Sequence, residues 1–571
     1  MVPASIRGVP AMNMNLKPVQ RFRLLLFCPL LLLPPQTLAD QPNILLLMAE
    51  DMSPRVGAYG DAVAVTPNID QLAREGVRYT RVFTTAGVCA PSRAAMVLGM
   101  HQVATGTQHM RTSSRPEGGY LAVPPPDVKA YPELLRRAGY YTYTDTKLDY
   151  QFSRAFAGSG PFSIWDAENA TTGGWRGRDP GEPFFGQRNF LVSHESGVFR
   201  QLGSWPNNRR HFMTQLYRWQ NFGWVDDVVD PADVPLPPYY PDTPTARTDV
   251  ARHYNNIAAM DREVGEILQA LEADGLKDST IVIWTSDHGD GLPRAKRELH
   301  DSGIHVPMIV RWPERYRPRG VQPGSVDDRL VSAVDFAPTI LGFAGVEPPE
   351  YLQGESFVAS DRQYVFASRD RIDAIADRQR AVRDERYKYI RSWYPAQEEG
   401  HPLAYRDDID MVQEMRAMFE AGELDADQRR WFEPVGEERL YDLESDPHEL
   451  RNLAADPAHA GTLSRLRTAL EMWMANIGDL GDVPESELVD RFGTYPVVPG
   501  TPGPVATIED CTLTIASDNP GSSIGYRREG EERWRLYTGP LDHCESPVAE
   551  IRAVRYGWQA SPAEVLPVGG S

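Results

Sequence analysis

The sequence predicts an α/β fold: a large, mostly parallel central sheet flanked by helices, followed by a smaller C-terminal α+β subdomain and a small β-rich appendage. Strand-like and helix-like patterns alternate from Asp40 to about residue 345, as in sheets built from βαβ units. Continuous apolar runs at 44–48 and 280–285 are typical of strands that are buried on both faces. The chain has 571 residues, 41% of them hydrophobic, which is enough for a substantial core and two or three domains.

Two helices on this sheet have clear sequence signals. Thr66-Pro67-Asn68 begins one helix, because proline fits the first turn of a helix. Thr243-Pro244 begins a longer helix, which Gly275 ends. The apolar residues of this longer helix recur at helical spacing, at Val250, Ile257, Val264, Ile267, Leu268 and Leu271. Residues 160–240 are rich in glycine, proline and aromatic residues, so we expect long loops there that shape a substrate cleft.

The remaining sequence predicts smaller units after the sheet. A hairpin at 381–394, a short strand at 440–443 and a helix at 458–477 form the α+β subdomain. Proline and glycine dominate 496–504, as in a linker, and the residues after it alternate short β-rich runs with turns. The expected division is a signal peptide at 1–39, a catalytic domain at 40–364, a C-terminal subdomain at 365–485, a linker at 486–504 and an appended β-rich domain at 505–571.

The N-terminus has the pattern of an export signal. A basic stretch ending at Arg23 precedes an apolar run of about ten residues, too short to span a bilayer, and Thr37-Leu38-Ala39 provides a cleavage site. An uncleaved interfacial anchor is the alternative. We therefore expect an exported protein, periplasmic or secreted, with no membrane span in the mature chain.

The charge balance limits the possible partners. The formal net charge of −20 argues against nucleic acid or an anionic membrane surface. An anionic substrate would require a local concentration of lysine and arginine.

The pentapeptide Cys89-Ala90-Pro91-Ser92-Arg93 is the most informative motif. Pro91 suits the first turn of a helix that continues to Leu98 and that Gly99 can end. Residue 89 would then lie at a helix N-terminus, where free N–H groups favour negative charge. The alternative is a buried structural cysteine beside a proline turn.

Two acidic pairs follow the two buried strands. Glu50 and Asp51 come after the first strand, and Asp287 and His288 come after the second. The carboxyl ends of parallel strands carry the site in open α/β sheets. Carboxylates that converge there repel one another unless a cation neutralises them, and oxygen ligands suit Ca²⁺ or Mg²⁺. Each pair alone is also explained by an Asx turn that ends a strand.

The pentapeptide resembles the signature of the type I sulfatases of the alkaline-phosphatase-like superfamily. In that family a formylglycine-generating or sulfatase-maturing enzyme oxidises the cysteine to formylglycine. The resemblance implies that the geminal diol of residue 89 attacks sulfur with one hydroxyl and expels sulfate with the other. It extends from about Asn43 to Ala454. The segments 245–249 and 260–265 look most like the branch of heparan N-sulfatase (sulfamidase) and its bacterial relatives.

The resemblance also implies the metal ligands. Glu50, Asp51, Asp287 and His288 match the family's metal-binding positions, with Ca²⁺ favoured over Mg²⁺. Glu50 departs from the commoner aspartate, and His288 is a softer ligand than the asparagine that the family also uses.

Further residues match positions that bind the sulfate group. Lys147 and Lys296 resemble the family's two sulfate-binding lysines, and Arg93 stabilises charge beside them. His194 resembles the histidine that serves the leaving group. Asp149 occupies a position where the family often has histidine.

The implied substrate is a sulfated saccharide, with O-sulfo esters or N-sulfo groups. His109, Arg111 and His305 lie near the matched motifs in the sequence and are candidates to contact the sugar; ordinary loop residues are the alternative. If Cys89 is modified and the signal peptide is removed, Cys511 and Cys544 remain and we expect them to form a disulfide in an oxidising compartment.

Two other functions remain open from the sequence. One is a phosphonate or phosphodiester hydrolase of the same superfamily, which would cleave aryl phosphate esters in preference to aryl sulfates. The other is a non-catalytic protein that binds sulfated glycans and would lack the aldehyde at residue 89.

Overall fold

The computed structural model describes residues 41–114 and 118–567. The predicted signal peptide, 1–39, lies outside the described residues. None of the helices in the described part combines the length and apolar character that crossing a bilayer requires.

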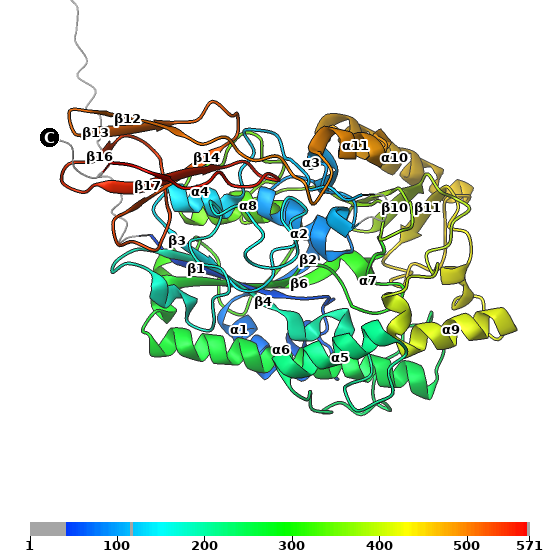
Figure 1. The fold of residues 1–571 in the computed structure, drawn as a ribbon. Coiled ribbons are helices and arrows are strands. Elements are labelled where there is room, and N and C mark those ends of the chain that lie inside the picture. Colours follow the sequence, from blue (N-terminus) through cyan, green and yellow to red (C-terminus); the bar gives the residue numbers. More distant parts are fainter. Residues whose placement is uncertain (1–40, 115–117, 568–571) are drawn as a thin grey trace, which may run out of the picture. The chain divides into compact units, whose positions relative to one another are not determined.

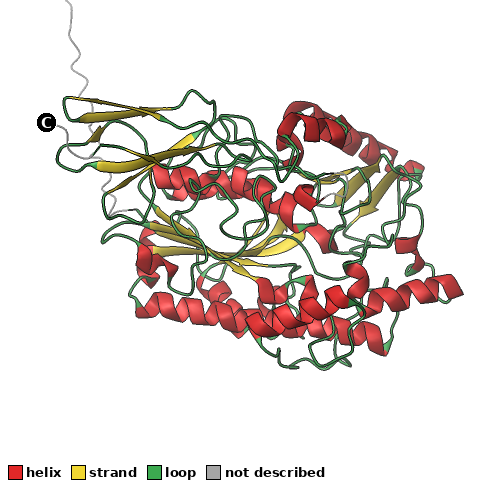
Figure 2. Cartoon of the chain, in the orientation of Figure 1, coloured by secondary structure: helices red, strands yellow, loops and turns green. Residues whose placement is uncertain are grey.

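A seven-stranded sheet forms the centre of the structure (Figures 1 and 2). Its strand order is β3-β4-β1-β5-β6-β2-β7. Only β6 runs against its neighbours, pairing antiparallel with β5 and β2, so the expected mostly parallel sheet is confirmed. The strands are β1 (Asn43–Ala49), β2 (Val77–Phe83), β3 (Tyr141–Thr144), β4 (Phe184–Phe190), β5 (Thr280–Ser286), β6 (His305–Arg311) and β7 (Val326–Ser332).

Helices cover both faces of this sheet (Figure 1). Alternate residues of β1 pack into hydrophobic clusters on opposite faces of the sheet, because successive side chains of a strand point to opposite faces. Ile44, Leu46 and Met48 pack with one layer of helices, whereas Leu45 and Leu47 pack with the other. The first layer contains α2 (Cys89–Leu98), α4 (Tyr131–Arg137) and α8 (Phe336–Phe343), and the second contains α1 (Pro67–Glu75) and α6 (Pro244–Ala273). The short helices α3 (Gln102–Thr105) and α7 (Asp301–Ile304) lie in loops.

The expectation of loops throughout 160–240 is wrong for two segments, the strand β4 and a helix. Arg209–Phe222 forms a helix, α5, that begins where the side chain of Asn208 accepts a hydrogen bond from the backbone N–H of His211. Its buried residues are His211 and Gln215, which are polar. Its larger apolar side chains, among them Phe212, Met213 and Trp219, are exposed, so this helix buries no apolar face against the core.

The C-terminal subdomain contains a four-stranded antiparallel sheet in the order β11-β10-β9-β8. The hairpin expected at 381–394 is the pair β9 and β10, and the expected strand and helix are β11 and α10. The elements are β8 (Val365–Arg369), β9 (Gln379–Arg383), β10 (Tyr387–Ser392), β11 (Glu438–Asp442), α9 (Asp410–Ala421), α10 (Ala460–Ile477) and α11 (Glu485–Phe492).

The last segment forms two small sheets, one ordered β12-β13-β16 and the other β15-β14-β17-β18. The predicted disulfide between Cys511 and Cys544 is present. This segment packs against α4, where the Tyr556 hydroxyl donates to Glu133 Oε2 at 2.8 Å. Its strands are β12 (Val505–Glu509), β13 (Thr512–Ala516), β14 (Ser523–Arg528), β15 (Arg535–Leu536), β16 (Leu541–Asp542), β17 (Val548–Val554) and β18 (Glu564–Val565).

Candidate active site

The two acidic pairs meet at the carboxyl ends of β1 and β5. These strands are parallel neighbours, and Ala49 pairs with Ser286 at their ends. The next residues on each strand are therefore side by side, and the backbone N–H of Asp51 donates to Asp287 Oδ1 at 3.1 Å. Both carboxylates are fully buried. Such a concentration of acidic groups is stable only with opposite charge beside it.

Cys89 is the first residue of α2 and lies against this acidic cluster. Its Sγ is 3.3 Å from His288 Nε2 and 3.8 Å from Asp51 Oδ1. Ser92, one turn into α2, donates from its hydroxyl to the backbone carbonyl of Asp287 at 2.5 Å and so fixes the helix start to the end of β5. The predicted helix, from Cys89 to a glycine in the left-handed conformation at Gly99, is confirmed.

Arg93 is the central cation beneath the cluster. Its Nε donates to Asp287 Oδ2 at 2.9 Å and one terminal nitrogen donates to Asn189 Oδ1 at 2.7 Å, while the other pairs with Glu50. Lys147 pairs with the second oxygen of Glu50. Burial raises the pKa of Glu50 to about 7, because the attraction of Arg93 and Lys147 offsets only part of the lost hydration.

Lys296 and His194 lie on the other side of Asp51. Lys296 Nζ is 2.6 Å from Asp51 Oδ2 and 3.3 Å from His194 Nε2. Burial and the positive charge of Lys296 hold the pKa of His194 well below its usual range, so its imidazole is neutral near pH 7. Burial disfavours the charged form of Asp51, but Lys296 and the charged His288 outweigh it and keep the pKa of that carboxyl well below its ordinary value.

Asp51, Asp287 and His288 form a donor set that fits a divalent cation. With Cys89 Sγ, one ligand atom from each lies within 4.8 Å of the others. His288 Nδ1 is 2.9 Å from the carbonyl of Gly289, which orients the ring so that Nε2 faces the two carboxylates. Burial opposes a charge on His288, yet Asp287 and Asp51 raise its pKa well above the usual range.

Glu50 has a different environment from the other predicted ligands. It forms a second possible group with Asp51, Cys89 and His194. Both of its carboxylate oxygens, however, already pair with Arg93 and Lys147. Metal binding by Glu50 would require at least one of these ion pairs to rearrange.

A cavity of about 570 Å³ opens over residue 89. This volume lies in the range of about 300–1,000 Å³ that is usual for small-molecule sites. The cavity brings together six of the predicted residues, namely Cys89, Arg111, Lys147, Asp149, His194 and Lys296. Their local positive charge contrasts with the net charge of −20 of the whole chain.

Two candidate sugar-contacting residues do not line this cavity. His305, the first residue of β6, stacks on Phe83 and has Nε2 2.8 Å from the carbonyl of Thr80. His109 Nδ1 accepts from the backbone N–H of Arg371 at 3.3 Å. Proximity to the motifs in the sequence suggested both residues, but their backbone positions direct the imidazoles into packed regions.

Sequence reasoning missed Glu195, Arg297 and Tyr405, which also line the cavity. The backbone N–H of Glu195 donates to Asp51 Oδ2 at 2.6 Å, and its carboxylate lies 3.1 Å from Lys296 Nζ and 2.8 Å from Arg297. Glu195 and Arg297 directly follow His194 and Lys296 in the sequence, and this adjacency to predicted site residues could have identified them. Tyr405 comes from a distant loop without any local signal.

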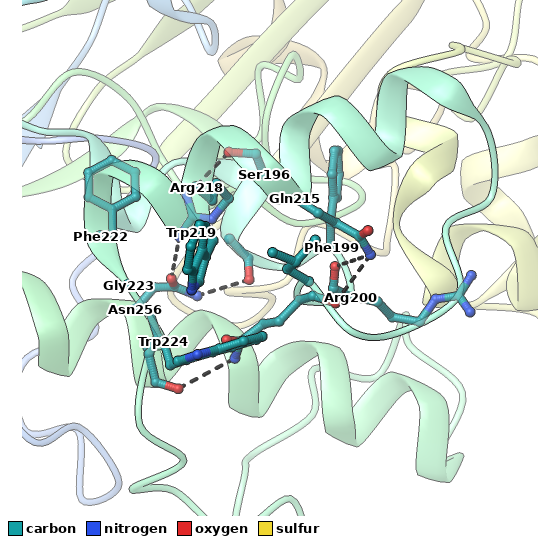
Figure 3. A pocket seen from close by; sticks show the side chains of 14 residues that line it. Ser196, Phe199, Arg200, Gln215, Arg218, Trp219, Phe222, Gly223, Trp224 and Asn256 are labelled. Atoms are coloured by element: carbon teal, nitrogen blue, oxygen red, sulfur yellow. Dashed lines mark hydrogen bonds between the residues drawn. The ribbon is translucent and has the colours of Figure 1, made fainter.

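A second hollow lies beside α5 (Figure 3). Trp219, Trp224 and Asn256 line it, and its volume of about 20 Å³ accommodates about one water molecule. Arg218 donates to Asn256 Oδ1 at 2.7 Å inside it. The residues that line this hollow therefore hold α5 in place, and the hollow is too small for a substrate.

Comparison with known proteins places the chain in a family. The sulfatase family model matches residues 42–346, and the model for the C-terminal region of N-sulphoglucosamine sulphohydrolase matches 294–429. An ulvan-active sulfatase of Formosa agariphila is 40% identical over 563 residues, covering 92% of this chain and 91% of its own. Human N-sulphoglucosamine sulphohydrolase is 27% identical over 481 residues, covering 78% and 92%.

The fold agrees with these sequence matches. The crystal structure of a putative sulfatase from Bacteroides thetaiotaomicron superposes with a TM-score of 0.54 at 21% identity, covering 77% of this chain and 94% of that one. The sheet, the cysteine at the start of α2 and the family matches lead to one conclusion: this chain belongs to the sulfatase family and is a sulfuric ester hydrolase.

Proposed function

We propose that this sulfatase removes a sulfate ester or N-sulfo group from a sulfated saccharide, with residue 89 as its nucleophile. The observation that carries the proposal is the position of Cys89 at the base of a cavity that two lysines and a histidine also line. The Sγ of Cys89 stands where the oxygens of a formylglycine side chain would lie. Formylglycine, formed by a maturing enzyme, would supply a hydrated aldehyde whose hydroxyls can attack sulfur and later release sulfate.

Lys147 and Lys296 are proposed to bind the sulfate group. Both are buried, and their ammonium groups pair with different carboxylates of the acidic cluster, Lys147 with Glu50 and Lys296 with Asp51. Burial lowers the pKa of Lys296, but Asp51 and other acidic neighbours more than compensate and hold it well above the ordinary value, so the lysine stays charged. Fixed positive charges in a site that excludes water stabilise the charge that builds on sulfate oxygens during cleavage.

His194 is proposed to protonate the leaving oxygen or nitrogen. Its Nε2 borders the cavity beside Lys296, and its Nδ1 is 3.1 Å from the hydroxyl of Ser196. This contact fixes the ring plane, so that Nε2 faces the substrate. A neutral imidazole must gain a proton before it acts as an acid, and a bound anionic sulfate would favour that protonation.

Asp51, Asp287, His288 and Glu50 are proposed to hold one divalent cation, with Ca²⁺ favoured over Mg²⁺. Such a cation would supply positive charge that polarises the sulfate group and the nucleophile. Mostly oxygen ligands of flexible geometry suit calcium. Metal analysis of the purified protein should find about one ion per chain, and Asp287→Asn protein should contain much less. Full metal content in this variant would disprove the assignment.

A sulfated saccharide is the proposed substrate because of the relatives' names. One relative is named for activity on ulvan and another for hydrolysis of N-sulphoglucosamine, a sulfated sugar. Export to the periplasm or medium is proposed from the N-terminal sequence pattern, and an exported location would bring the enzyme to polymeric substrates.

Mass spectrometry of the peptide that contains residue 89 tests the proposed function. We expect loss of sulfur with gain of one oxygen and loss of two hydrogens. Cys89→Ala protein should lose nearly all turnover of an aryl sulfate, and Cys89→Ser protein should accumulate a sulfated serine.

The same assays separate the competing functions. Wild-type protein should cleave aryl sulfates faster than aryl phosphates. Active enzyme with an unmodified thiol at residue 89, or preference for the phosphate ester, would overturn the proposal.

A further inference from the structure

Arg111 and Asp149 have unsatisfied polar groups in the cavity over Cys89. Arg111 follows α3 and Asp149 follows β3, so two separate loops bring them to one wall. Both adopt left-handed backbone conformations, with φ of 53° and 58°. Such conformations are strained in non-glycine residues and occur where the surrounding structure imposes them.

Arg111 differs from the other cationic residues of the cavity, because each of those has a charged partner. Lys147 pairs with Glu50, Lys296 with Asp51, Arg297 with Glu195, and Arg210 with Asp408. Within the described residues, the guanidinium of Arg111 takes part in no hydrogen bond or ion pair. Among the described cavity residues, Arg111 is therefore the cation that a second anionic group can bind without competing with an existing ion pair.

Asp149 is complementary to this arginine. Its side chain is 4% exposed, and Oδ2 is buried without a hydrogen-bond partner among the described residues. The charge of Asp149 is the largest influence on Arg111 and raises the pKa of the guanidinium. The two groups are thus close enough to interact electrostatically but are not hydrogen-bonded. Because a buried acceptor without a partner is unfavourable, a ligand that donates a hydrogen bond to it is favoured.

We propose that Arg111 and Asp149 form a subsite that recognises the sugar. Arg111 binds a second anionic group of the saccharide, and Asp149 accepts a hydrogen bond from a neighbouring hydroxyl. This inference rests on the proposed function, because it assumes that a saccharide enters the cavity. The fork of a guanidinium matches both a carboxylate and a sulfate. The substrate class is therefore a sulfated saccharide with a further acidic group beside the sulfate that is cleaved.

Kinetics with three saccharides of equal length test the subsite. Each carries one cleavable sulfate: the first is otherwise neutral, the second has an adjacent carboxylate, and the third has an adjacent second sulfate. Wild-type enzyme should prefer one or both charged substrates in kcat/KM. Arg111→Gln should reduce that preference roughly tenfold to 100-fold, mainly through KM, and Arg111→Lys should reduce it less. The substrate whose preference collapses identifies the anion as carboxylate or sulfate.

Two further variants complete the design. Asp149→Ala should lower kcat/KM for neutral and charged saccharides alike, because both carry the hydroxyl. Arg209→Gln is the matched control: it removes the same charge from an exposed arginine at the start of α5, outside the cavity lining, and should keep the preference. Equal preferences in wild-type and Arg111→Gln protein would overturn the subsite.

Binding measurements separate this inference from the proposed function. Calorimetry with Cys89→Ala protein and the same three saccharides requires no turnover. Tighter binding of a charged saccharide that Arg111→Gln removes supports the subsite even if no saccharide is cleaved, an outcome that would refute only the proposed function. Cleavage of all three saccharides without any charge preference would refute only the subsite.

Discussion

At the scale of single residues, Arg93 links the acidic groups of the site. It is 1% exposed and contacts Glu50, Asp287 and Asn189, so it neutralises carboxylates from the ends of two strands. The same arginine belongs to the Cys-x-Pro-Ser-Arg motif, one helical turn after Cys89. The motif thus places the cysteine at the start of α2 and anchors this helix to the acidic cluster.

Loss of Arg93 should destabilise the protein strongly. Arg93→Gln leaves two buried carboxylates without their main cation, and breaking a buried pair in this way costs about 3–5 kcal/mol. Urea unfolding in the presence of a chelator measures the loss. Arg81→Gln is the control, because its ion pair with Glu385 is largely exposed and should contribute less than about 1 kcal/mol. Equal stability of the two variants would contradict the role of Arg93.

At the scale of elements, the start of α2 depends on close backbone packing. Gly87 precedes the helix by two residues, and a Cβ at this position would lie 2.3 Å from the carbonyl oxygen of Glu298. No side chain fits there unless the backbone shifts. The segment that contains Lys296 and the segment that leads to Cys89 therefore pack directly against each other.

Gly87→Ala should displace Cys89 and reduce activity. We expect kcat/KM for an aryl sulfate to fall at least tenfold, because misplacement of a reacting group by about 1 Å can cost 100-fold. Stability should fall by about 1–3 kcal/mol. Gly342→Ala in α8 is the control: nothing lies within 4 Å of its Cβ, and alanine in a helix is favoured by about 0.5–1 kcal/mol. Unchanged activity in Gly87→Ala protein would show that this contact is not needed.

At the scale of the whole molecule, Glu133 connects helix α4, which covers the central sheet, to the C-terminal β-rich segment. Its carboxylate on α4 accepts from Ser163, Ser523 and Tyr556. Burial alone would raise the pKa of Glu133, but Lys129, Arg137 and the hydroxyls of Ser163 and Ser523 lower it to about 2. The charged carboxylate is therefore part of the contact between the two regions.

This pKa predicts a specific loss of stability in acid. A pKa that is lower in the folded state stabilises the protein above the unfolded value of about 4.3, and that contribution disappears as the pH falls toward 2. The contribution is about 3 kcal/mol, from a shift of roughly two units. Unfolding of wild-type and Glu133→Gln protein at pH 6 and pH 3 measures it. The difference between the two proteins should shrink at pH 3, and a difference independent of pH would contradict the prediction.

The disulfide should stabilise the C-terminal segment without affecting catalysis. Cys511 and Cys544 are 33 positions apart, and closing such a loop contributes about 3–4 kcal/mol in chain-entropy models. Neither cysteine lines the active-site cavity. Reduction should lower the unfolding temperature and leave aryl sulfate turnover nearly unchanged. A large loss of activity would show that this segment supports the cavity.

The sequence by itself determined the parts of the molecule that local patterns encode. Apolar runs located β1 and β5, Thr-Pro pairs located α1 and α6, and one pentapeptide located the start of α2. Two parallel strands that end together bring Asp51 and Asp287 to one edge, so the acidic cluster was predictable from general topology. The disulfide followed from the small number of cysteines.

Only the tertiary structure decided which polar groups are already paired. The sequence grouped Glu50 with Asp51, and the structure adds that Glu50 pairs with Arg93 and Lys147, which no local pattern shows. It grouped His305 with Arg111, yet only Arg111 lines the cavity, because His305 stacks on Phe83. Helix α5 was missed because the glycine, proline and aromatic content of the surrounding residues favoured loops. These outcomes depend on contacts between residues far apart in the chain, and side-chain direction at such contacts is set by packing, which no local pattern encodes.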